Sequence, residues 1–261
     1  MPPSITALYR YPVKGLSPEA LNRTEIPAGG SMPFDRAFAI ENGPSDFDPL
    51  APAYLPKIAF LMLMRNERLA GFQTRFDGGT GLLTVEKDDA ICVSGSLGTK
   101  AGRAAIEAWI ARTFADELRG GPKIVSADGH SFSDKRAKVL HLVNLASIRD
   151  LEKHMGRPVD PLRFRPNIVI DGAEPFAEFE WIDKRLRLPD IVLAGESRTE
   201  RCAATNVDPT TAARDMQIPR TLMGLYGHAD FGIYLLAETG GTLSVGDRLS
   251  IEVRAASSLP F

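Results

Sequence analysis

Short segments that alternate in hydropathy or are rich in β-branched residues recur along this chain, and glycine, proline or aspartate separates them. This spacing predicts many short strands joined by tight turns. The predicted strands cover residues 4–11, 36–40, 58–64, 69–76, 82–86, 91–93, 167–170, 186–188, 191–194, 232–237 and 248–253. We expect 58–64 and 69–76 to pair as a hairpin, and the whole pattern favours a barrel-like arrangement.

Helical periodicity is restricted to two segments. Apolar residues recur at helical spacing through 102–118, and Leu145, Ile148 and Leu151 share one face of 144–155. Asn144 suits the N-cap of the second helix and Gly156 its end. The sequence therefore predicts a β-rich mixed α+β fold with a few helices. The Gly-Gly-Pro stretch at 120–122 predicts a boundary between regions 1–121 and 122–261.

Charge and cysteine content limit the function classes. With 31 basic and 33 acidic residues the net charge is −2, so nucleic acid is not an expected partner, and any anion site must be local. The two cysteines exclude a disulfide framework and favour a reducing compartment. The first residues lack a signal-peptide pattern, and the apolar runs are too short to span a bilayer. We expect a cytoplasmic protein with no membrane segment.

Several familiar sites are absent from the sequence. There is no glycine-rich dinucleotide fingerprint, no Walker-type lysine motif and no Gly-x-Ser-x-Gly nucleophile elbow. The four histidines are scattered without zinc-ligand spacing. His141 alternates with leucines in a strand-like run, which is typical of a half-buried structural histidine. The remaining candidates are basic residues and one cysteine.

The segment 163–167 offers a pair of guanidinium groups. Arg163 and Arg165 flank a phenylalanine, and alternate residues of an extended segment face one side. Two such groups suit a phosphate or carboxylate because each planar fork donates parallel hydrogen bonds. The alternative is a solvated basic turn. Lys14 and Arg36, each at a strand end, could add cations to such a site or could be ordinary surface residues.

Cys202 follows Arg201 within a polar, loop-like stretch. A neighbouring positive charge favours the thiolate, which is both a nucleophile and a metal ligand. The alternative is an inert buried thiol. Cys92 lies between Ile91 and Val93, and we interpret it as part of a strand core.

Six motifs occur in an order that resembles the MOSC family, in its two-part form with an N-terminal β-barrel region before the MOSC domain. The motifs lie at residues 11–15, 34–38, 164–169, 201–209, 231–234 and 245–247. Each is weak alone, and together they span most of the chain. The resemblance extends to the amidoxime-reducing branch of the family.

The resemblance implies a molybdenum-pterin cofactor in the molybdopterin form, with Cys202 as the metal ligand at the catalytic centre. It implies that Lys14, Arg36, Arg165 and Arg201 hold the pterin's phosphate and polar edges, with Asn167 and Tyr234 in support. Asp208 is expected to shape the loop behind the cysteine. The implied activity is reduction of small N-hydroxylated or related N-oxygenated compounds. Electrons would come from a separate ferredoxin- or cytochrome b5-like protein, without pyridoxal phosphate.

Two departures from the family pattern leave alternatives open. The family often has a Cys-Ser-Arg-Cys run, whereas Thr199 stands here in place of its first cysteine. The residues at 55–60 also lack the family's polar Gln-Arg stretch, so substrate contacts are expected to differ. The alternatives are a carrier or sulfuration module for other molybdoenzymes, and a protein that kept the fold but binds another anionic ligand.

Overall fold

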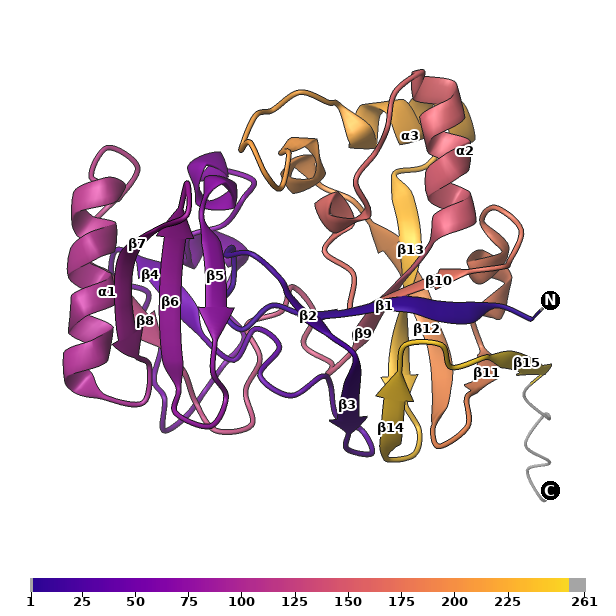
Figure 1. The fold of residues 1–261 in the computed structure, drawn as a ribbon, viewed down its shortest axis with the longest axis horizontal. Coiled ribbons are helices and arrows are strands. Elements are labelled where there is room, and N and C mark those ends of the chain that lie inside the picture. The colour runs from indigo at the N-terminus through magenta and orange to yellow at the C-terminus, as the bar shows by residue number, and fades with distance from the viewer. Residues whose placement is uncertain (1, 254–261) are drawn as a thin grey trace.

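The computed structural model describes residues 2–253, and two halves of the chain lie side by side in it (Figure 1). The large-sheet half contains one eight-stranded sheet with the order β15-β11-β12-β13-β9-β10-β1-β2. Its strands are β1 (Ser4–Arg10), β2 (Glu19–Leu21), β9 (Leu140–Asn144), β10 (Ile168–Asp171), β11 (Lys184–Arg187), β12 (Val192–Glu200), β13 (Asp230–Ala237) and β15 (Ser250–Val253). A separate pair, β3 (Arg23–Ile26) with β14 (Gly241–Ser244), lies beside it.

The large sheet curls until the beginning of β1 meets the segment that leads into β15. Ile5 N donates to Asp247 O at 2.9 Å, and Gly246 N donates to Ile5 O at 2.8 Å. Leu249 N donates to Pro3 O at 2.9 Å, which continues this seam. Closure of this kind satisfies backbone groups that an open edge would expose. The predicted β-rich, barrel-like α+β fold is confirmed.

The helices of the large-sheet half are α2 (Leu145–Met155) and α3 (Ile218–Tyr226), which lie near one another in Figure 1. The sequence predicted α2 and its caps correctly. Asn144 Oδ1 accepts from Ala146 N at 3.0 Å, and Gly156 ends the helix at a φ of 67°, where glycine avoids a side-chain clash. Helix α3 was not predicted. Its nine residues are too few for periodicity to distinguish it from an apolar loop.

The small-sheet half contains α1 (Lys100–Thr113), the sheet β5-β6-β7 and the pair β4-β8. Its strands are β4 (Ala39–Asn42), β5 (Gln73–Phe76), β6 (Leu82–Lys87), β7 (Ala90–Ser96) and β8 (Pro122–Val125). Trp109 and Ile110 of α1 pack with Leu83 and Val85 of β6 in one apolar core. The predicted helix at 102–118 is confirmed in position, although it begins and ends earlier.

The predicted hairpin between 58–64 and 69–76 is wrong. Short 3-10 helices η1 (Lys57–Ala59) and η2 (Glu67–Gly71) interrupt both segments, and β5 pairs with β6 instead. Asn66 explains part of the error, because its side chain accepts from Met62 N at 3.1 Å and closes a local turn. The core assignment of Cys92 is also wrong. It lies exposed on the edge strand β7, next to the Asp88–Asp89 turn.

Strand pairing crosses the boundary expected after residue 121. β8 pairs with β4 in the small-sheet half, while β1 and β2 join the large sheet. The division at 121 therefore stays a prediction about folding units, and the hydrogen bonding interleaves the two regions. Within residues 2–253, no helix combines the length and apolar character that a bilayer crossing requires.

Candidate functional site

A pocket opens between the two halves, and the seven residues predicted from the sequence all line it. It encloses about 890 Å³ including its open mouth. The seven are Lys14, Arg36, Arg165, Asn167, Arg201, Cys202 and Tyr234. Four further lining residues were not predicted from the sequence as part of the site: Met62, Met64, Asp134 and His141. His141 pairs with Tyr234 across neighbouring strands.

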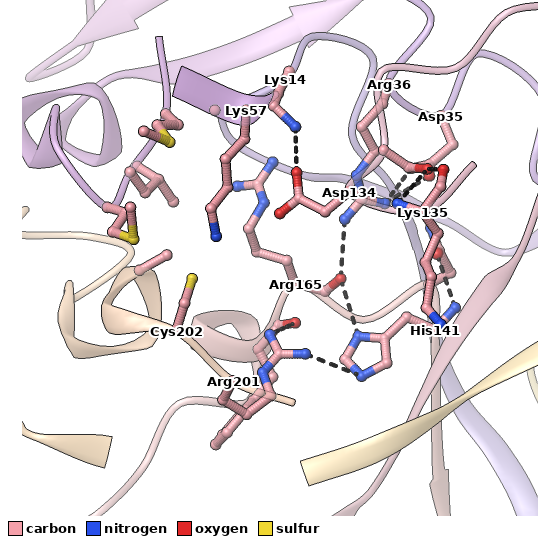
Figure 2. A pocket seen from close by; sticks show the side chains of 18 of the residues that line it. Lys14, Asp35, Arg36, Lys57, Asp134, Lys135, His141, Arg165, Arg201 and Cys202 are labelled. Carbon is pink, nitrogen blue, oxygen red and sulfur yellow. Dashed lines mark hydrogen bonds and ion pairs between the residues drawn. The ribbon is translucent and has the colours of Figure 1, made fainter. Parts of the chain in front are cut away.

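Cys202 stands where β12 gives way to the short helix η5 (Ala203–Asn206). Its carbonyl accepts hydrogen bonds from Thr205 N at 3.1 Å and Thr205 Oγ1 at 2.9 Å, so local contacts fix its backbone. The side chain is half-buried, and Figure 2 shows its sulfur directed into the open centre of the pocket. The thiol is therefore available to a ligand inside the pocket.

Arg201 is half-buried beside the cysteine. Its Nη2 donates to Phe164 O at 2.7 Å, and its guanidinium carbon lies 5.5 Å from the centre of the Phe164 ring. Its Nε is buried without a hydrogen-bond partner. Burial lowers the pKa of Arg201, since a charge removed from water is less stable. A buried donor with no acceptor is costly, so an anionic ligand would relieve it.

Arg165 presents a second unpartnered donor. Its Nη1 donates to Leu16 O at 2.9 Å, its guanidinium lies 4.1 Å from the Tyr11 ring centre, and its Nη2 is buried without a partner. Burial, with repulsion from Arg36, lowers the pKa of Arg165 to about 10. The group stays charged at neutral pH and lacks a carboxylate partner among the described residues.

The expected alternation of Arg163 and Arg165 along an extended segment is wrong. Residues 161–164 form the 3-10 helix η3 (Pro161–Phe164), and Arg165 follows it with a φ of 53°. Arg163 Nη2 instead pairs with Asp208 at 2.7 Å and Asp215 at 2.9 Å. Asp208 also accepts from the backbone N–H groups of Thr210 and Thr211, so it organises the loop after Cys202.

Lys14 and Arg36 are charged but already partnered. Lys14 Nζ lies 2.6 Å from Asp134 Oδ1 and donates to Phe132 O at 2.8 Å. Arg36 Nη1 donates to both carboxylate oxygens of Asp35, at 2.7 and 2.6 Å. Burial lowers the pKa of Lys14, although Asp134 opposes that shift. These two cations add positive potential, whereas Arg165 and Arg201 keep donors free.

Asn167 and Tyr234 differ in what they can offer. The Asn167 amide accepts from His141 N at 3.1 Å and donates to Tyr9 O at 3.1 Å, so it mainly joins strands. Tyr234 stands on β13 with Lys135 Nζ 5.1 Å from its ring centre. Burial raises the pKa of Tyr234, which keeps its hydroxyl protonated as a donor at neutral pH.

His141 on β9 lies between Arg165 and Arg201, the two arginines that each keep a donor without a partner. Its Nε2 lies 3.4 Å from Arg201 Nη1, and its Nδ1 lies 3.5 Å from Arg165 O. Arginine can only donate, so Nε2 must accept and Nδ1 must carry the proton. Burial first, and then Arg201, lower the pKa of His141 well below its usual value. Gly232 allows this approach, because a Cβ there would lie 2.8 Å from His141 Nε2.

A neutral buried His141 predicts a specific dependence of stability on pH. The folded pKa lies below the unfolded value of about 6.5, so this stability is present above that pH and is lost as the pH falls. Unfolding of His141→Gln should bind at most one proton fewer than unfolding of the wild type. The slope of its unfolding free energy against pH should therefore be smaller by at most about 1.4 kcal/mol per pH unit. Urea unfolding between about pH 7 and pH 5 measures this. Parallel curves for the two proteins would contradict the neutral state.

The site lacks the protein ligands for an independent metal centre. Within residues 2–253, no group of three or more His, Cys, Asp or Glu side chains is placed to hold a metal ion. A metal at Cys202 would therefore take most of its ligands from a bound organic cofactor. The free donors of Arg165 and Arg201 fit the phosphate of such a group, so the residues present are compatible with a metal-pterin cofactor.

Two known domain families match parts of this chain. The MOSC domain matches residues 123–250, and the MOSC N-terminal beta barrel domain matches residues 3–116. The chain belongs to the MOSC family. This confirms the resemblance inferred from the six motifs, and the MOSC pocket described above lies where the two matched regions meet.

Several curated relatives of this MOSC protein are mitochondrial amidoxime-reducing components. The human component 1 is 32% identical over 118 residues, which are 41% of this chain and 34% of the relative. The rat component 2 is 33% identical over 120 residues, which are 41% of this chain and 35% of the relative. The aligned part thus spans about a third of each relative's length. Among solved structures, the YUAD protein from Bacillus subtilis has a TM-score of 0.45 and 13% identity, covering 96% of both chains.

Proposed function

We propose that this protein binds a molybdenum-pterin cofactor between its halves and reduces small N-hydroxylated or related N-oxygenated compounds. The observation that carries the proposal is the pair of buried, unpartnered donors, Arg165 Nη2 and Arg201 Nε, in the pocket that the Cys202 thiol faces. The amidoxime-reducing names of the relatives support the reaction class.

The cofactor's phosphate would lie against Arg165 and Arg201. A phosphate monoester carries about −1.5 to −2 charges at neutral pH, close to the charge of two guanidinium groups. Their forks give directed, charge-assisted hydrogen bonds that are stronger than neutral ones. Lys14 and Arg36, held by Asp134 and Asp35, would add long-range attraction and contacts at the pterin's polar edges. Asn167 would support this wall from behind.

When bound, the cofactor would supply two-electron redox chemistry, and Cys202 would hold its metal through the sulfur. The chain's own residues orient the substrate and manage charge. Reduction of an N-hydroxyl group to the parent N–H compound and water consumes two electrons and two protons. The Tyr234 hydroxyl, protonated at neutral pH, can donate a hydrogen bond to the departing oxygen. The electrons would come from a separate redox protein of the ferredoxin or cytochrome b5 type.

The alternative of a sulfuration module receives no support from the pocket. A sulfur relay needs a second reactive thiol near the first, and the chain's other cysteine, Cys92, lies on edge strand β7 of the small-sheet half. Thr199, which replaces the family's first cysteine, is buried in β12. We therefore give priority to the reductase.

The test is to purify the full chain from a host that makes the cofactor. We expect molybdenum and pterin in near-equal amounts, and reduction of an amidoxime with a chemical reductant. Loaded protein without turnover, but able to transfer its cofactor to an apo-molybdoenzyme, would favour a carrier. Protein that contains neither molybdenum nor pterin would overturn the proposal.

A further inference from the structure

The pocket contains one more unpaired cation than the cofactor's phosphate needs. Its basic lining residues are Lys14, Arg36, Lys57, Lys135, Arg163, Arg165 and Arg201. Four of these have carboxylate partners, namely Lys14, Arg36, Lys135 and Arg163. Arg165 and Arg201 match a phosphate dianion. Lys57 forms no salt bridge among the residues the structure describes. The carboxylate that acts on its charge is Asp134, which already pairs with Lys14, so these two lysines share one carboxylate.

Lys57 begins η1 in the small-sheet half, on the wall opposite the large sheet. Its side chain is partly exposed, and across residues 2–253 its Nζ makes neither a hydrogen bond nor an ion pair. Figure 2 shows this Nζ directed into the hollow that the Cys202 sulfur also faces. A lysine that points inward, when it could extend into water, favours an anionic ligand.

An apolar wall adjoins Lys57 on the same segment. Met62, Leu63 and Met64 line the pocket. Arg214 fixes this wall beside the cysteine loop, because its Nη2 donates to Leu63 O at 3.2 Å and Met64 O at 2.8 Å while its Nη1 donates to Ala203 O at 3.3 Å. The thioethers of methionine are flexible and make favourable contacts with aromatic rings.

We propose that Lys57 binds a carboxylate on the substrate, whose apolar or aromatic body packs on Met62 and Met64. The substrate class is then a small N-oxygenated compound that also carries an anionic group. This inference rests on the proposed function for its reaction, but its binding step can be tested alone. Lys57 comes from the small-sheet half, whereas Arg165 and Arg201 come from the large-sheet half, and we assign Lys57 to a second anion.

The binding test compares benzoate with its neutral isostere benzamide, by calorimetry at low ionic strength on the full chain. We expect wild-type protein to prefer benzoate, and Lys57→Met to weaken benzoate by about fivefold while leaving benzamide unchanged, since a partly exposed ion pair contributes that much. Lys57→Arg should restore the preference. Lys153→Met, an equal charge change on the exposed face of α2, is the matched control.

Three outcomes would overturn the assignment. The first is equal binding of benzoate by wild type and Lys57→Met. The second is a loss of pterin from Lys57→Met, which would assign the lysine to the cofactor. The third concerns Arg165. Arg165→Gln tests whether benzoate binds at the phosphate site instead. If benzoate binds to Lys57, this variant should still prefer benzoate to benzamide. If benzoate binding instead disappears in Arg165→Gln, the proposed second anion site is wrong.

A kinetic comparison then joins the binding step to the reaction. The ratio of kcat/KM for 4-carboxybenzamidoxime to that for benzamidoxime should fall by about fivefold in Lys57→Met, through KM and not through kcat. If neither amidoxime is reduced by wild type, the proposed function fails while the benzoate result still decides the role of Lys57. An unchanged ratio would contradict the substrate class.

Discussion

Replacing Cys202 by serine is expected to remove molybdenum from the protein while leaving the fold intact. A hydroxyl is a far poorer ligand than a thiolate for a soft metal, and no other described side chains gather to hold one. We expect bound molybdenum to fall at least about tenfold, because mutating a residue that only hydrogen-bonds to a metal ligand already lowers metal affinity by that factor. Elemental analysis of purified variant and wild type measures it.

The fold should tolerate this change for a local reason. Thr205 bonds to the Cys202 carbonyl and not to its sulfur, so serine keeps the turn into η5. Cys92→Ser is the matched control, because it removes the other thiol from an exposed position on β7 and should retain full molybdenum. Full occupancy in Cys202→Ser, or equal loss in both variants, would exclude Cys202 as the ligand.

Local sequence signals predicted those parts of the fold that local physics determines. The cap of α2 is one case, because Asn144 and Gly156 act within a few residues of themselves. Strand β13 is another, because its alternating apolar residues, Ile233, Leu235 and Ala237, pack in the core of the large sheet. The family motifs predicted which residues form the site, and periodicity alone could not have identified them.

The errors arose where distant partners override local pattern. The stretch 58–64 is apolar enough for a strand, yet the Asn66 turn and the bridge from Glu41 to Phe60 give it a different path. Cys92 has strand neighbours on both sides, but its strand lies at a sheet edge where that position is exposed. Sequence pattern gives the strand and not its place in the sheet.

The same limit applies to the candidate site. The sequence offered Lys14, Arg36, Arg165 and Arg201 as equals. The structure separates the first two, which pair with Asp134 and Asp35, from the last two, which keep buried donors free. Lys14 and Asp134 are 120 residues apart, so no spacing rule could connect them. The counterions, and hence the surplus charge of Lys57, became visible only in three dimensions.

Charge reversal at Arg165 is expected to abolish cofactor retention. In Arg165→Glu, the new carboxylate would repel the phosphate that the wild-type guanidinium, which also donates to Leu16 O, attracts. Loss of one charge-assisted contact alone costs about 1.5–3 kcal/mol. We therefore expect pterin content to fall about tenfold in Arg165→Gln and further in Arg165→Glu. Fluorescence of the released, oxidised pterin measures both.

Two comparisons separate loss of binding from loss of fold. Arg165 lies against the buried Tyr11 ring, and a cation–π contact of this kind contributes about 0.5–2 kcal/mol, so both variants should unfold at somewhat lower urea. Arg187→Glu is the matched control, since it reverses the exposed charge of Arg187 on β11, which pairs with Glu252 of β15. It should keep its pterin. If Arg165→Glu also keeps its pterin while remaining folded, the phosphate lies elsewhere, and Arg201 alone, with its free Nε, would be the group to test next.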